Sequence, residues 1–132
     1  MNKKEFNTLE EIQKYYDEKS NTYIFKENDD FLVELVIFNF DLKVEANIRA
    51  CNIDADNIEA LDICARNINV DNIKARDIDA FDIDAIDVTA RDILVDNIKA
   101  RNIDAREIDC CDTCVASENI KCKSIIGGRT ED

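Results

Sequence analysis

A five-residue unit, Ile-x-Ala-x-Asn/Asp, repeats almost without interruption from Asn47 to Val115. Counted from residue 48, fourteen consecutive units begin with Ile in twelve cases, and Ala holds the third position in ten. The fifth position is nearly always Asn or Asp, whereas the second and fourth positions accept charged, polar and apolar residues. A period this short and strict is typical of a solenoid, in which similar units stack on one another.

The five-residue period fits neither a simple helix nor a simple strand. In a helix each residue advances by about 100°, so successive Ile side chains would spiral around the axis and form no buried face. In a strand Ile and Ala share one face, but the next Ile then falls out of phase. The chain must therefore bend once per unit. We place the bend at Asn or Asp, which tolerate unusual backbone angles, because the chain has two Gly and no Pro.

With this pattern the chain resembles the pentapeptide-repeat family over residues 47–115. The resemblance implies an all-β solenoid, namely a right-handed quadrilateral parallel β-helix of about four coils with four pentads in each coil. Residues twenty apart would then be stacked neighbours. The sequence departs from the usual family pattern in one respect. The family places its small residue directly before Asn or Asp, whereas here Arg76 separates Ala75 from Asp77.

The four-per-coil arrangement predicts an outward apolar cluster. Leu61 and Phe81 would stack on one face, with Ile86 on the adjoining face. One interpretation is a surface for a partner protein or a dimer; the other is the ordinary scatter of exposed apolar side chains on a soluble protein.

The same arrangement predicts an acidic level in the solenoid. Four bend positions in succession, Asp77, Asp82, Asp87 and Asp92, would form one coil, between coils whose bends are largely neutral. These four carboxylates are the candidate acidic surface.

The segment before the repeat has a different composition. Thr8-Leu9-Glu10-Glu11 matches a capping box and predicts a helix from about Thr8 to Glu18. Branched and aromatic residues predict strands over Thr22–Phe25 and Phe31–Val44. We expect residues 1–46 to cap the first coil, because the end of a solenoid exposes its core and its strand edges.

Residues 47–132 are expected to form the β-helix with an irregular C-terminal end, in one domain with the cap. After Val115 the phase of the repeat slips by two residues. We expect no capping helix there. One interpretation is that Lys121 and Lys123 protect an exposed edge against strand addition; the others are a homodimer interface and a shortened terminus.

Charge and hydropathy restrict the partners. The net charge of −13 disfavours direct nucleic-acid binding, since phosphates require clusters of Lys and Arg. We see no apolar stretch near membrane-spanning length and no signal peptide, so we expect a cytoplasmic protein without membrane contact.

Six Cys and no His limit the chemistry. Cys110, Cys111, Cys114 and Cys122 lie close in sequence and raise the question of zinc. Cys110 and Cys122 replace inward Ala, whereas Cys111 and Cys114 occupy free positions, so we expect reduced thiols without metal. Without His no catalytic triad can form, and carboxylates that recur with the repeat indicate solvated turns. We therefore expect neither an enzyme nor a cofactor.

Two functions remain. The first is a rigid scaffold or protein–protein interaction module with an unidentified partner. The second is an acidic DNA mimic that binds a DNA-binding protein such as DNA gyrase, as the quinolone-resistance members of the family do. Eight bases interspersed through the repeat argue against the second.

Overall fold

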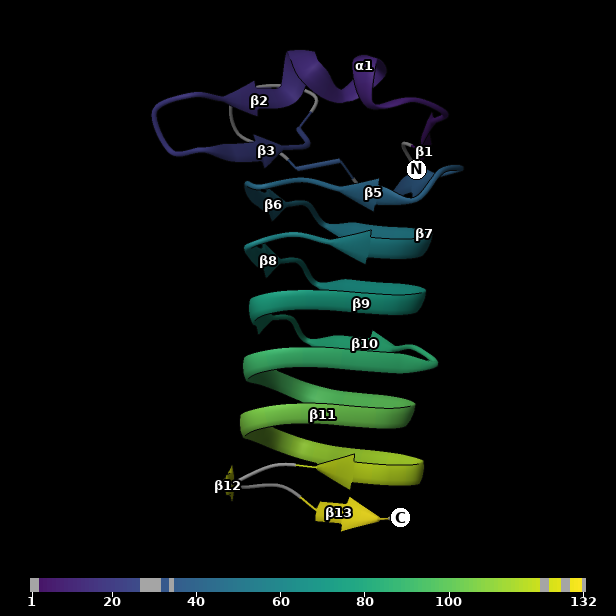
Figure 1. Cartoon of the computed structure of the whole chain (residues 1–132), viewed down its shortest axis with the longest axis vertical. Helices are drawn as coiled ribbons and strands as arrows, with labels where there is room; N and C mark the ends of the chain where they lie inside the picture. The colour runs from purple at the N-terminus through teal and green to yellow at the C-terminus, as the bar shows by residue number, and fades with distance from the viewer. Residues whose placement is uncertain (1–2, 27–31, 34, 122–123, 127–128, 132) are drawn as a thin grey trace.

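The protein is an all-β parallel solenoid of about six turns, with 72% of its residues in strands and one short helix at the N-terminal end (Figure 1). This computed structural model describes residues 3–26, 32–33, 35–121, 124–126 and 129–131. The predicted fold class is confirmed, whereas the expectation of about four coils is wrong.

The strands and helices follow one another along the solenoid axis. In chain order they are β1 Lys3–Phe6, α1 Leu9–Ile12, the 3-10 helix η1 Gln13–Tyr15, β2 Tyr16–Asp17, β3 Thr22–Ile24, β4 Leu35–Phe38, β5 Leu42–Lys43, β6 Asn47–Arg49, β7 Asn52–Glu59, β8 Asp62–Cys64, β9 Asn67–Asp79, β10 Asp82–Asp84, β11 Asp87–Lys121, β12 Ser124–Ile126 and β13 Arg129–Glu131.

Each coil of the repeat contains fifteen residues, which is three pentads. Asn52 of β7 pairs in parallel with Asn67 of β9, and Asn67 pairs with Asp82 of β10, so stacked partners are fifteen residues apart. The predicted quadrilateral coil of twenty residues is therefore wrong. A physical reason is the size of the core. Close packing leaves no voids, and Ile with Ala can fill only the narrow interior of a three-sided coil.

The three sides of the coil are named here face A, face B and face C. Face A comprises β6, β8, residues 77–79 of β9 and residues 92–94 and 107–109 of β11. Face B comprises residues 52–54, residues 67–69, β10 and residues 97–99. Face C comprises residues 57–59, 72–74 and 87–89.

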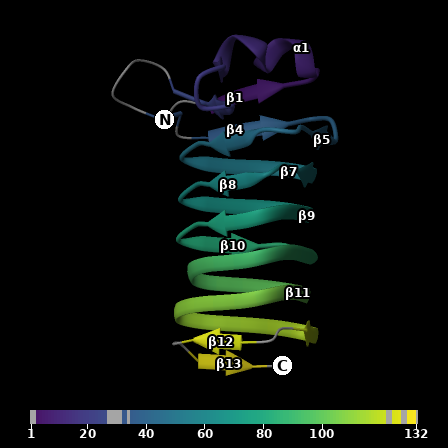
Figure 2. The ribbon, with the colours of Figure 1, turned by 60° about the vertical axis from the view of Figure 1, so that its left-hand side comes forward.

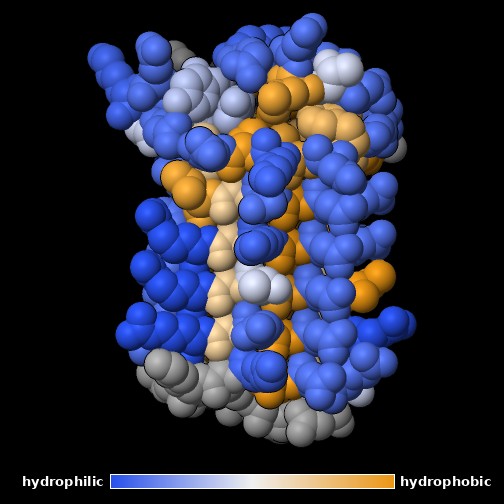
Figure 3. Space-filling model, in the orientation of Figure 1, coloured by the Kyte–Doolittle hydropathy of each residue, from blue (hydrophilic) through white to orange (hydrophobic). Residues whose placement is uncertain are grey.

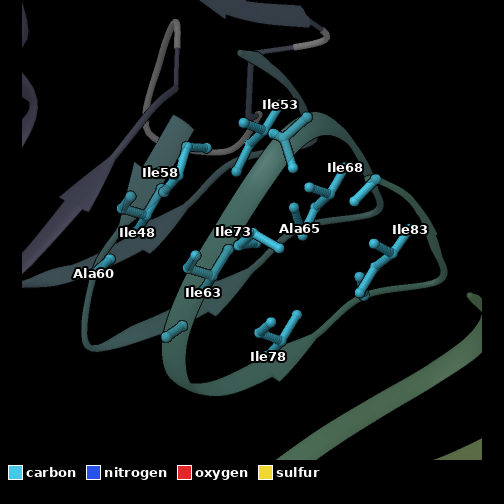
Figure 4. Packing of buried hydrophobic residues seen from close by; sticks show 14 of the residues in the cluster. Ile48, Ile53, Ile58, Ala60, Ile63, Ala65, Ile68, Ile73, Ile78 and Ile83 are labelled. Atoms are coloured by element: carbon cyan, nitrogen blue, oxygen red, sulfur yellow. The ribbon is translucent and has the colours of Figure 1, made fainter. Parts of the chain in front are cut away.

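Isoleucine forms the core of all three faces. Figure 4 shows labelled Ile side chains from successive strands directed into the interior of the coil. Ile63 of β8 pairs with Ile48 on one side and with Ile78 on the other, and all three are almost fully buried. Alanine at the third position is buried as well, as Ala65 and Ala80 illustrate. The inward assignment of Ile and Ala is therefore confirmed.

The bends lie one residue before the position that we expected. The chain bends at the fourth residue of the unit, for example at Arg66, Phe81 and Ile86, and Asn or Asp begins the next strand. Among the described non-glycine residues only Asn21 has a positive φ, so Asn and Asp in the repeat do not serve to adopt left-handed angles.

The fifth position instead supplies hydrogen bonds between coils. Nδ2 of Asn97 donates to Oδ1 of Asp82 at 2.9 Å on face B. On face C, Nδ2 of Asn102 donates to Oδ1 of Asp87 at 2.7 Å, and Asn57 donates to Asp41 at 2.8 Å. These ladders link side chains one coil apart and explain the preference for Asn and Asp.

The N-terminal helix is shorter than predicted. It ends at Ile12, η1 follows, and the chain is extended from Tyr16, where β2 pairs antiparallel with β3. The side chain of Thr8 makes no capping hydrogen bond, although the Glu11 carboxylate accepts one from the Asn7 N–H at 3.3 Å. The helix forms where Ile12 is buried against the core, because a short isolated helix is only marginally stable in water.

Aromatic side chains gather between the helix and the first strands. The Phe6 and Tyr15 rings are 5.5 Å apart, and the Phe25 and Phe38 rings are also 5.5 Å apart. In Figure 2 the helix lies over β1 and β4, at the opposite end of the solenoid from β12 and β13. The strand predicted over Thr22–Phe25 corresponds to β3, and the described part of Phe31–Val44 contains β4 and β5.

Near the C-terminal end the coil contains more than fifteen residues. Glu107 pairs with Ser124, a spacing of seventeen residues, and Thr113 pairs with Arg129, a spacing of sixteen. The predicted two-residue slip in phase is therefore present in β12.

Candidate partner-binding surface

The predicted apolar cluster is not formed. The Phe81 N–H donates to the Arg66 carbonyl at 2.9 Å, and the Ile86 N–H donates to the Asp71 carbonyl at 2.8 Å. Phe81 and Ile86 lie at opposite ends of β10, and Leu61 is partly buried at a third corner, before β8. The fifteen-residue coil is the reason, since it makes Arg66 rather than Leu61 the neighbour of Phe81.

A different apolar pair lies at the edge of face A. Phe81 is 57% exposed and Leu94 is 46% exposed. Leu94 pairs with Asp79, its carbonyl accepts the Ala80 N–H at 3.0 Å, and the next residue after Ala80 is Phe81. Leu94 therefore lies in the strand paired with residues 77–79, and Phe81 lies in the bend that follows those residues.

Leu94 is not among the residues of the predicted apolar cluster. A twenty-residue coil places it beside Lys74 and Cys114, away from Phe81. Aligning the units in threes would have placed it opposite Asp79.

A groove runs along face A between two rows of outward side chains. Its volume is about 650 Å³, and its lining includes Thr22 of β3 and the strands of five successive coils from Asn47 to Asp109. One row continues from Asn47 through the fifth positions, and the other contains Cys64 and Leu94 at second positions, with the buried Ile row between them. Figure 3 shows such rows as hydrophilic bands that alternate with narrow hydrophobic bands along the solenoid.

Carboxylates and guanidinium groups interleave along one edge of this groove. Asp92 stacks on Asp77, and Asp77 stacks on Asp62. Nη2 of Arg76 lies 2.8 Å from Oδ2 of Asp62, and Nη2 of Arg91 lies 3.5 Å from Oδ2 of Asp77. The row of acids on face A is therefore bridged by Arg, where the other two faces use Asn.

Asp77 is the least well compensated of these acids. Burial raises its pKa, the Arg91 guanidinium opposes this, and the stacked carboxylates of Asp62 and Asp92 raise the pKa further. Its Oδ1 atom is enclosed and has no hydrogen-bond partner among the described residues.

The four predicted acids do not form one coil. Asp77, Asp82 and Asp87 lie on faces A, B and C of one level, whereas Asp92 lies one coil further on and stacks on Asp77. Asp82 and Asp87 accept hydrogen bonds from Asn97 and Asn102. The three-sided coil distributes these charges around the solenoid.

The cysteines are placed partly as expected. Cys110 is buried, and its Sγ donates to the Asp96 carbonyl at 3.4 Å. Cys114 is also buried, so its assignment to an outward position is wrong, because the phase has begun to shift by one residue there. The side chain of Cys111 and the whole of Cys122 lie outside the described residues. In the part of the chain that the structure describes, no three His, Cys, Asp or Glu side chains are arranged to hold a metal ion.

Among the described residues, no helix is long and apolar enough to cross a membrane. Comparison with protein families, curated proteins and solved structures gives no match to this chain.

Proposed function

We propose that this chain is a non-enzymatic rigid scaffold that binds a partner protein at the edge of face A, around Phe81 and Leu94. The observation that carries the proposal is the position of these two exposed apolar side chains, Leu94 on a strand and Phe81 in the bend after the paired strand, beside a groove. A few well-packed side chains, with aromatic ones prominent among them, contribute most of the binding energy in protein interfaces.

The regular backbone supports the role of a scaffold. Each described strand of the repeat pairs with the coils above and below it, and Asn or Arg side chains link successive coils at the corners. A surface held in this way loses little conformational freedom on binding, which favours affinity.

The alternative function, an acidic DNA mimic, receives less support. Arg76 and Arg91 lie between the stacked acids of face A, and Asp82 and Asp87 are bonded to Asn side chains. A mimic of duplex DNA requires dense rows of uncompensated negative charge.

Membership of the pentapeptide-repeat family rests on the five-residue period alone, because that family has four pentads per coil. We also propose a cytoplasmic location. The thiols of Cys51 and Cys64 form no disulfide, as is usual in a reducing compartment. A homodimer through the C-terminal end stays a prediction, which light scattering on the full chain tests.

Site-specific photo-crosslinking in cells of the source organism tests the proposed surface. A photoreactive phenylalanine replaces Leu94 in one variant and Thr89, exposed on face C, in the control. We expect one partner to be crosslinked at position 94 and not at position 89, and Phe81→Asp to abolish that product. Ile86→Asp is the matched control for Phe81→Asp, since it adds the same charge at another corner. Equal crosslinking at both positions, or a product unaffected by Phe81→Asp, would contradict the proposal.

A further inference from the structure

We propose that the groove of face A binds an extended cationic segment of the partner protein, with an apolar side chain of that segment packed against Phe81 and Leu94. This inference rests on the proposed function and adds the chemistry of the partner.

The shape of the groove suits an extended chain that runs along the solenoid axis. The lining includes strands of face A from Asn47 to Asp109, which belong to five successive coils. Adjacent strands are about 4.8 Å apart, so the first and fifth are separated by about 19 Å. An extended segment rises about 3.3 Å per residue, and about six residues therefore span this length.

The charge of the groove selects a cationic occupant. Its described lining contains six acidic residues and one basic residue, a net of −5; the six acids are Asp62, Asp77, Asp79, Asp92, Glu107 and Asp109. The groove of face B has three acids and one base, and that of face C has three acids and two bases, which gives −2 and −1. Opposite charges on the two partners favour association and set its orientation.

The Arg side chains at the edge of face A reduce this difference in charge. Arg76 and Arg91 contact the row of acids but are not among the residues that line the groove. If both are counted together with Arg106, which holds the same position before Glu107, the net charge of face A is −2, the value of the face B lining, so selectivity for this groove also requires the apolar contact with Leu94 and Phe81.

Two local features add to the charge. The side chains of Asp62, Asp77 and Asp92 are 36%, 39% and 44% exposed along one edge of the groove, and a Lys or Arg of the segment would donate to their accessible oxygens. Leu94 lines the same groove, and the adjacent Phe81 extends the apolar surface at its edge. The site therefore offers both an anionic row and an apolar contact.

The probe is the blocked hexapeptide Lys-Lys-Leu-Leu-Lys-Lys, titrated into the ¹⁵N-labelled full chain at about 50 mM salt. We expect amide shifts to be concentrated in the strands of face A. The reversed-charge peptide Glu-Glu-Leu-Leu-Glu-Glu should not bind, and Lys-Lys-Ser-Ser-Lys-Lys should bind more weakly.

Two pairs of variants separate a specific groove from general attraction to an acidic protein. Asp79→Asn and Asp84→Asn remove the same charge from second positions on faces A and B. We expect only Asp79→Asn to weaken binding, by about two- to fivefold, the range for exposed charge contacts. Leu94→Ser should weaken binding more than Ile86→Ser, although both remove a half-exposed apolar side chain.

The inference is overturned if the peptide does not bind, if shifts cover all three faces, or if Asp79→Asn and Asp84→Asn weaken binding equally. None of these results affects the proposed function, which is tested by crosslinking at position 94. A crosslinked partner whose contact segment is acidic or neutral would remove this inference and leave the scaffold proposal in place.

Discussion

Replacement of Ile78 by Ala measures how strongly the stacked core holds the solenoid together. Ile78 is 1% exposed and lies between Ile63 and Ile93 in the core of face A. The substitution removes three carbon groups, each of which contributes about 0.8 kcal/mol when buried, or about 2.4 kcal/mol in total. Because close-packed neighbours collapse only in part around the space that is left, we expect a loss of about 3 kcal/mol.

The assay is equilibrium urea unfolding followed by far-ultraviolet circular dichroism. Ile86→Ala is the matched control, since Ile86 is 40% exposed and its replacement should cost at most about 1.4 kcal/mol. Ile78→Val, which removes one carbon group, should cost about 1 kcal/mol. Equal losses for Ile78→Ala and Ile86→Ala, at unchanged urea dependence, would refute the inward and outward assignments.

Three further predictions concern Asp77, Asn102 and Cys64. The pKa of Asp77 is raised in the folded protein, so its carboxylate lowers stability as pH rises from the unfolded pKa of about 3.9 through the higher folded pKa. Asp77→Asn should therefore gain stability over the wild type as pH rises above the unfolded value, and urea midpoints that move together with pH would contradict this. Asn102→Ala removes the donor to Asp87 and should cost about 1–2 kcal/mol in urea unfolding, against less than about 0.5 kcal/mol for Thr89→Ala. Cys64 is exposed, so iodoacetamide should modify it before the buried Cys51, and mass spectrometry of the modified peptides checks this order. Partial burial of the thiol, followed by the Asp79 charge, raises the pKa of Cys64, so the rate of its modification should increase above pH 9.

The sequence determines the solenoid but leaves the number of sides open. Strict Ile and Ala positions require a bend in every unit and an apolar interior, and the structure buries these residues. A period of five divides both fifteen and twenty, so the pattern alone does not decide between three and four pentads per coil. The choice depends on how well Ile and Ala side chains fill the interior, which is a property of three-dimensional packing.

The candidate surface shows the consequence of that ambiguity. Exposure of Phe81 and Ile86 follows from their position in the unit and was predicted correctly. Which exposed residues are neighbours depends on the coil length, and the assumed length wrongly placed Leu61 beside Phe81 and concealed Leu94. The role of Asn and Asp was misjudged for a related reason, because hydrogen bonds between coils become visible only when the stacked partner is known.

The central claim, a coil of three pentads, is tested most directly by contacts between backbone protons in a nuclear Overhauser spectrum of the labelled full chain. The account predicts cross-strand contacts between residues fifteen apart in the repeat, such as Ile63 with Ile78 and Asn67 with Asp82. Backbone contacts between residues twenty apart, such as Ile58 with Ile78, in place of these would contradict it.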